Sequence, residues 1–274
     1  MQDLLVRATS LGDWDAGVRC AARIAASQRA ALTALYVVPG GLPAMPASAW
    51  DGGEMAAAYA VELAREVREA EQRAPAFAAW ASSMGVPHPT WLASAGEAAD
   101  AFAYVGNWHD LLVLPLDNDG EDPWSAAGGV ARIVLRAALP CLVLPRGADV
   151  PERCDVAAVA FNGSVESIRA LHAALPLLRE ARRVVMLAGD RQQPLAPLPD
   201  FPLEAWCERH LPHVEYAPLD PGAEGAGILQ AAQAAGAQLL AMGAYGRSRF
   251  SEWVLGGVTR HMLLNAGIPL LMRH

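Results

Sequence analysis

The 274-residue sequence contains no lysine, and all 21 of its basic residues are arginine. This absence excludes the classes of protein whose chemistry requires a lysine amine, such as P-loop nucleotidases, Schiff-base enzymes and protein kinases. The four cysteines lie far apart and form no CxxC pair, so we expect incidental thiols rather than a metal centre or disulfides. No uninterrupted apolar run reaches the ~18 residues of a membrane-spanning helix, and the first residues lack the basic stretch of a signal peptide. We therefore expect a cytoplasmic protein without membrane association.

The composition is that of a globular protein with a sizeable core. Apolar residues make up 53% of the sequence and charged residues 18%. The formal net charge is −8, which disfavours binding to phosphate backbones, so we expect no nucleic-acid partner. At roughly 100–200 residues per domain, the length fits one large domain or two small ones.

The sequence contains an internal repeat. Asp110–Pro115 resembles Gln238–Gly243, and Gly128-Gly129-Val130 matches Gly256-Gly257-Val258, both at an offset of 128 residues. The starts of the two halves match at an offset of 152, so the first copy holds 24 additional residues. We expect these residues in the Ala-, Glu- and Arg-rich stretch Met55–Met84, which should form an interrupted helix.

Short apolar runs bounded by turn residues predict strands, and helical spacing predicts helices between them. The predicted strands are Leu4–Ala8, Leu32–Val38, Thr90–Ala93, Leu111–Leu114, Leu142–Leu144, Val156–Phe161, Arg183–Ala188, Val214–Ala217, Leu239–Met242 and Leu270–Met272. The predicted helices outside Met55–Met84 are Asp15–Ala26, Glu97–Val105, Val130–Ala137, a helix capped by Ser164, Leu203–Leu211, Gly225–Ala235 and Val258–Asn265. This alternation predicts an α/β protein of two tandem doubly wound domains, each a five-stranded parallel sheet with helices on both faces. The domains are 1–148 and 153–274, separated by a polar stretch.

One glycine pattern indicates a ligand site. Gly243-Ala-Tyr-Gly246 follows an apolar strand, and after nine further residues Gly256-Gly257-Val258-Thr259 leads into a helix. Glycines let backbone N–H groups approach an anion, and a helix N-terminus offers free donors and a positive dipole end. The pattern therefore predicts a phosphate site, and the alternative is a tight strand–helix connection.

The spacing G-x-x-G-x9-G followed by Val-Thr resembles the nucleotide-binding signature of the universal stress protein family. Phe161-Asn162-Gly163-Ser164 is similar to that family's first strand and turn, and Glu166–Leu178 to its first helix. The resemblance is clear over Arg153–His274 and weaker over residues 1–150. The chain thus resembles a tandem universal stress protein.

The resemblance implies a stress-response protein that binds ATP or another adenine nucleotide in its C-terminal domain, with no metal beyond a nucleotide-associated Mg²⁺. Carried over by position, the implied nucleotide-binding residues are Asn162, Gly163, Ala188, Met242, Gly243, Gly246, Arg247, Gly256, Gly257, Val258 and Thr259. Two of them depart from the family pattern. Asn162 replaces an aspartate, and Gly257 replaces a serine or threonine whose hydroxyl would bond a phosphate.

The first copy departs further. Pro115 and Asn118 take the places of Gly243 and Gly246, and a loop with four carboxylates follows: Asp117, Asp119, Glu121 and Asp122. These charges would repel a polyphosphate, so we interpret domain 1–148 as degenerate and structural.

Three functions remain open from the sequence. The first is a regulatory protein that binds an adenine nucleotide, and the second is a structural or interaction protein that has lost the ligand. The third is an enzyme, at most a slow ATPase, for which the sequence shows no catalytic residue. Universal stress domains pair through their last strands, so the resemblance implies a homodimer or an internal pseudo-dimer. The sequence names no protein partner.

Overall fold

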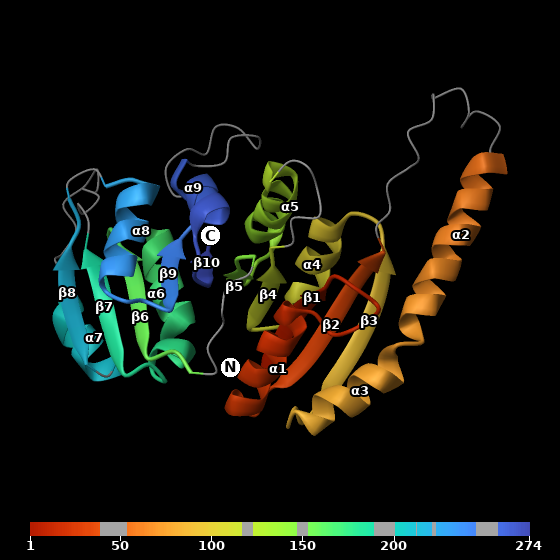
Figure 1. The fold of residues 1–274 in the computed structure, drawn as a ribbon, viewed down its shortest axis with the longest axis horizontal. Helices are drawn as coiled ribbons and strands as arrows, with labels where there is room; N and C mark the ends of the chain where they lie inside the picture. Colours follow the sequence, from red (N-terminus) through yellow and green to blue (C-terminus); the bar gives the residue numbers. More distant parts are fainter. Residues whose placement is uncertain are drawn as a thin grey trace. The chain divides into compact units, whose positions relative to one another are not determined.

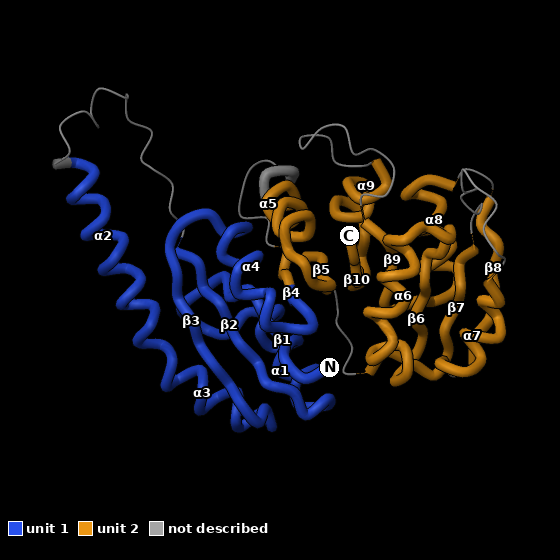
Figure 2. Tube along the Cα trace, turned by 180° about the vertical axis from the view of Figure 1, so that it is seen from behind, with its two compact units in different colours: residues 1–113 blue, residues 114–274 orange. Residues whose placement is uncertain are grey.

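The computed structural model alternates strands and helices along the chain (Figure 1). It describes residues 1–38, 54–116, 123–146, 153–188, 201–211, 213–220, 223–244 and 257–274. The chain divides into two compact units, an N-terminal unit Met1–Val113 and a C-terminal unit Leu114–His274 (Figure 2).

The N-terminal unit is a parallel sheet with helices packed against it. Its strands follow the order β3-β2-β1-β4, and the unit ends within β4. The strands are β1 (Asp3–Ala8), β2 (Ala31–Val38), β3 (Pro89–Ala95) and β4 (Leu111–Pro115), and the helices are α1 (Ala16–Gln28), α2 (Glu54–Glu71), α3 (Ala74–Ser83) and α4 (Ala98–Gly106).

The C-terminal unit contains a sheet of order β5-β10-β9-β6-β7-β8. Its strands are β5 (Cys141–Leu144), β6 (Val156–Phe161), β7 (Arg183–Ala188), β8 (Val214–Pro218), β9 (Leu239–Gly243) and β10 (Leu270–Arg273), and its helices are α5 (Pro123–Arg136), α6 (Val165–Leu178), α7 (Leu203–His210), α8 (Gly225–Ala234) and α9 (Gly257–Asn265). Strands β6 to β10 pair in parallel, whereas β10 and β5 pair antiparallel. The last strands of the two sequence copies therefore pair with each other inside one chain, as expected for an internal pseudo-dimer.

The fold class predicted from the sequence is confirmed, and each predicted strand is present within a few residues. Strands that are buried on both faces read as continuous apolar runs. All five residues of β4 and the first four of β9 are buried, and these runs lie at the centre of the α/β layers. The packing units divide the chain at Val113, because β5 pairs with β10. The repeat-based domains 1–148 and 153–274 follow sequence similarity instead and stay a prediction.

The start of one helix was predicted wrongly. The sequence pattern predicts a helix from Val130, but α5 begins at Pro123 and continues through Gly129. Proline suits the first turn of a helix because the N–H that it lacks has no intrahelical partner there. The glycine pair of the first copy therefore lies inside a helix, whereas α9 of the second copy begins at Gly257.

The stretch Met55–Met84, in which the additional residues of the first copy are expected, folds mainly as α2 and α3 and is called the insertion below. The helix is interrupted ahead of Pro75, which lies in the first turn of α3, as predicted. An aromatic cluster joins this insertion to the sheet: Trp14, Phe77, Trp80 and Trp91. The ring centroids lie 5.4–6.0 Å apart in every pair except Trp80 with Trp91. The indole N–H of Trp91 donates to the carbonyl oxygen of Ala70 in α2 at 2.8 Å.

Within the described ranges, the structure has no helix both long and apolar enough to cross a bilayer.

Candidate functional site

The register of the C-terminal unit brings the carboxyl ends of three strands to one edge. Phe161 at the end of β6 pairs with Ala188 at the end of β7. On its other side β6 pairs with β9, where Ala160 lies opposite Met242. The chain passes from β6 to β7 on one side and from β9 to β10 on the other, so the junction of β6 and β9 is a topological switch point. Open α/β sheets bind ligands at such a point, outside the carboxyl ends of the strands.

The turn after β6 is held by its own polar groups. The side-chain oxygen of Asn162 accepts a hydrogen bond from the backbone N–H of Ser164 at 3.1 Å. Gly163 has a φ of +76°, a conformation that glycine adopts without strain. Ser164 caps α6, as predicted, because its hydroxyl oxygen accepts a hydrogen bond from the N–H of Ser167 at 3.2 Å.

Gly243 ends β9 in close contact with the first turn of α6. A Cβ atom at this position would lie 2.7 Å from the backbone nitrogen of Ser167 and 2.8 Å from the carbonyl carbon of Glu166. The absence of a side chain at Gly243 therefore allows α6 to approach the strand end. This glycine has a packing role whether or not a ligand binds.

The predicted residues beyond β9 are only partly described. Gly246, Arg247 and Gly256 lie outside the described residues, as do the four acidic residues and Asn118 of the first copy. Gly257 begins α9 and is exposed, and no atom of the described residues lies within 4 Å of where its Cβ would be. Two residues further on, Thr259 is only 3% exposed, so its side chain packs into the unit.

Three other predicted residues lie at or next to the strand ends. Ala188 is exposed at the end of β7, and its carbonyl oxygen accepts a hydrogen bond from the N–H of Leu219 at 2.8 Å. Met242 is 3% exposed and belongs to the core. Val258 is half-buried in the first turn of α9. The structure thus gathers Asn162, Ala188 and Gly243 along one sheet edge, and their binding role stays a prediction.

Sequence reasoning missed Glu166. This residue occupies the first turn of α6 beside Gly243 and is only 8% exposed. An acidic residue near a helix N-terminus is ordinary, because it complements the helix dipole, so the sequence gave no reason to single it out. The burial of most of a glutamate residue is unusual and is visible only in the structure.

The corresponding edge of the first copy is built differently. Asp15 caps α1, and one carboxylate oxygen accepts hydrogen bonds from the backbone N–H and hydroxyl of Thr9 at 3.0 and 2.9 Å. The other oxygen accepts from the N–H of Val18 at 2.8 Å. A carboxylate of the chain itself therefore occupies the N-terminus of α1, where the second copy has the neutral Ser164.

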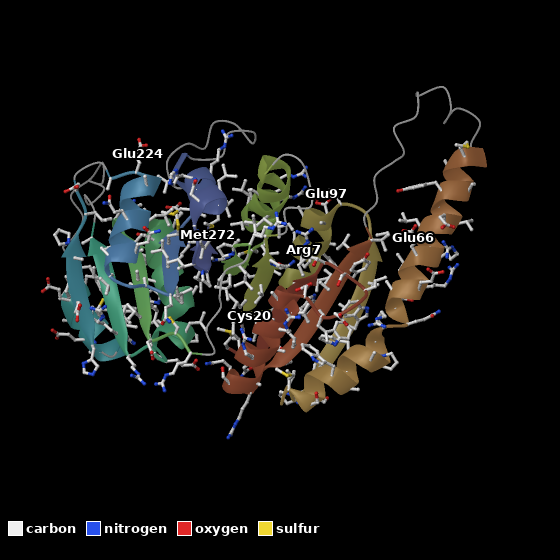
Figure 3. The ribbon with its side chains drawn as sticks, viewed as in Figure 1. Arg7, Cys20, Glu66, Glu97, Glu224 and Met272 are labelled. Atoms are coloured by element: carbon white, nitrogen blue, oxygen red, sulfur yellow. The ribbon has the colours of Figure 1, made fainter. Side chains whose placement is uncertain are left out.

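The described residues contain no group of three histidine, cysteine or acidic residues that could hold a metal ion. The four cysteines are free thiols. Burial raises the pKa of Cys20, labelled in Figure 3, to about 11 and that of Cys141 to about 12. Burial also raises the pKa of the half-buried Cys154 to about 11.

These raised pKa values predict slow thiol chemistry in the folded protein. At pH 8 a thiol with a pKa near 11 is ionised to roughly one part in a thousand, and the thiolate is the nucleophile. We expect the native protein to react with a disulfide reagent at least about 100-fold more slowly than an unfolded sample, with Cys154 first. Absorbance at pH 8 with and without denaturant measures this ratio, and rapid reaction of Cys20 or Cys141 would contradict it.

The comparisons with known proteins agree with this fold. Residues 212–274 match the model of the universal stress protein family. A universal stress protein from Archaeoglobus fulgidus superposes with a TM-score of 0.67 at 13% identity, covering 99% of this chain and 95% of that chain. A putative universal stress protein from Pseudomonas aeruginosa superposes with a TM-score of 0.58 at 15% identity, covering 100% and 93%. A functionally unknown protein from the same species superposes with a TM-score of 0.59 at 14% identity, covering 100% of this chain and 92% of that chain.

No curated protein sequence matches the chain. The C-terminal segment thus carries the universal stress protein signature, and the whole chain has the tandem fold of these structures. The resemblance seen in the sequence is confirmed.

Proposed function

We propose that the protein is a stress-response regulator that binds an adenine nucleotide, such as ATP, in its C-terminal domain. The observation that carries the proposal is the switch point between β6 and β9, with α9 beginning at Gly257 beyond the end of β9. A ligand at this edge meets the turn at Asn162 on one side and the start of α9 on the other. The match of residues 212–274 to the universal stress protein family supports the same site.

The start of α9 suits phosphate groups. The first N–H groups of a helix have no intrahelical acceptor, and the helix dipole adds positive potential there. Because Gly257 carries no side chain and its surroundings are open, an anion can approach the backbone directly. Arg247, which precedes α9 in the sequence, would add positive charge, and a bound nucleotide would bring Mg²⁺ with its phosphates.

Native mass spectrometry of freshly purified protein, followed by nucleotide analysis, tests the proposal. One adenine nucleotide per chain, or saturable binding of added ATP below millimolar concentration, is the expected result. An empty protein that ignores millimolar ATP would overturn it.

Gly257→Ser is expected to tighten ATP binding. The hydroxyl would lie at the first residue of α9 in open space, where it can donate to a phosphate oxygen. One hydrogen bond to a charged group is worth about 1.5 kcal/mol or more, so we expect a roughly 10-fold lower Kd by isothermal titration calorimetry.

Gly129→Ser is the matched control for this substitution. Gly129 is the counterpart of Gly257 in the first copy, and it also has open space around its Cβ position. Because it lies inside α5 rather than at a helix start, this variant should leave ATP binding unchanged. Equal affinities for wild type and both variants would contradict a phosphate at the start of α9.

A second candidate function is a structural or interaction protein that binds no nucleotide. The observation in its favour is that polar groups of the predicted site are already engaged within the chain, because Asn162 holds the turn and Thr259 is buried. The pairing of β5 with β10 would then serve to assemble a double domain. Either function needs no catalytic residue, so we propose ATP hydrolysis, if it occurs, to be slow.

A further inference from the structure

Glu166 is mostly buried, and its carboxylate has no partner among the described residues. The residue as a whole is 8% exposed. Within the described part of the chain, its side chain forms no hydrogen bond or ion pair. The residues on either side of Glu166 do not combine burial with a missing partner. Val165 is 56% exposed, and Ser167 is hydrogen-bonded to Ser164. Removing a carboxylate from water costs several kcal/mol unless donors replace the water. The described residues supply no such donor to Glu166.

The position of Glu166 is at the switch point. Its Cβ atom lies 2.8 Å from where a Cβ of Gly243 would be, so the side chain starts against the end of β9. Among the described residues, the fully buried side-chain atoms that lack a hydrogen bond are Arg73 Nε and Asp155 Oδ1, and the oxygens of Glu166 are not among them. Because these oxygens also form no hydrogen bond among the described residues, they keep some contact with solvent, which the hydroxyl groups of a ligand could replace.

We propose that Glu166 is a specificity-determining residue that binds the ribose of the nucleotide through its vicinal hydroxyl groups. This inference rests on the proposed function. An ionised carboxylate only accepts hydrogen bonds, and its two oxygens match two neighbouring hydroxyl donors. It also repels phosphate, so it belongs at the nucleoside end of the ligand, while the phosphates lie at the start of α9. Acidic residues bind ribose hydroxyls in the same way at the switch points of dinucleotide-binding folds.

The test is isothermal titration calorimetry of the full chain with ATP and with 2′,3′-dideoxy-ATP. Wild type is expected to bind ATP about 10-fold more tightly than the dideoxy analogue. Glu166→Gln should weaken ATP about 10-fold and leave the analogue unchanged, so that the preference is lost. Glu224→Gln is the matched control, because Glu224 is an exposed residue at the start of α8 whose side chain caps nothing (Figure 3).

A stability measurement separates ligand binding from a structural role. Glu166→Gln removes an unpaired charge, so its Tm without ligand should equal that of wild type or rise by a few degrees; a lower Tm would assign Glu166 a structural role and overturn the inference. If wild type binds ATP and Glu166→Gln keeps the same preference for ATP over the dideoxy analogue, the ribose contact alone is overturned. Wild type that binds neither nucleotide would overturn the proposed function and this inference together.

Discussion

Replacing Gly243 by alanine is expected to lower the free energy of unfolding by about 3 kcal/mol and Tm by about 6–12 °C. The added Cβ would meet the backbone nitrogen of Ser167 and the carbonyl carbon of Glu166 at distances that no relaxed structure tolerates. These are backbone atoms of α6, and α6 packs against β9 and β10. Relief of the clash therefore requires a shift of the whole helix rather than a side-chain rotation. Thermal and denaturant unfolding followed by circular dichroism measure the loss.

Gly257→Ala is the control for this substitution. It also introduces a methyl group into the predicted ligand site, but into open space at the start of a helix. Alanine favours a helix over glycine by up to about 1 kcal/mol, so the control should be as stable as wild type or slightly more so. A Gly243→Ala variant within about 1 °C of wild type would show that α6 does not press on the strand end.

These two glycines show what a sequence pattern can and cannot decide. Both belong to the same signature, yet Gly243 is explained by packing and Gly257 is not, because nothing in the described structure would meet a side chain there. The sequence predicts that some other group comes close to the backbone at both glycines. Only the structure distinguishes an approach by α6 from an approach left open to a ligand.

Much of the fold could be predicted because its central strands, such as β4 and β9, are buried on both faces. Runs such as Leu111–Leu114 and Leu239–Met242 have few conformations that bury every residue, and the internal repeat supplied the order of the elements twice. The cap at Ser164 and the interruption before Pro75 follow from local hydrogen bonding and ring geometry, which depend on few neighbours.

The failures have nonlocal causes. The first copy was aligned with the second at its glycine pair, so the start of α5 was placed at Val130 although Pro123 signals an earlier start. The burial of Glu166 depends on how α6 meets β9, which no local pattern encodes.

Replacing Trp91 by alanine is expected to cost about 4 kcal/mol, the other large effect on stability. Trp91 is 7% exposed on β3, and its ring lies 5.5 Å from that of Phe77 and 5.6 Å from that of Trp14, between ring centroids. Alanine would leave a cavity among these rings and would remove the hydrogen bond to Ala70 that ties α2 to the sheet. Since α2 and α3 pack on β3, the loss should loosen the insertion more than the rest of the unit.

Two measurements separate this effect from a general loss of packing. Trp108→Ala is the matched control, because Trp108 is 76% exposed after α4, and its stability should stay within about 0.5 kcal/mol of wild type. Trypsin cleaves after arginine, and Arg65, Arg68 and Arg73 lie in or next to α2. In Trp91→Ala these bonds should be cut at least about 10-fold faster under native conditions, because cleavage follows the population of the locally opened state. An unchanged cleavage rate together with an unchanged Tm would mean that Trp91 does not fasten the insertion to the sheet.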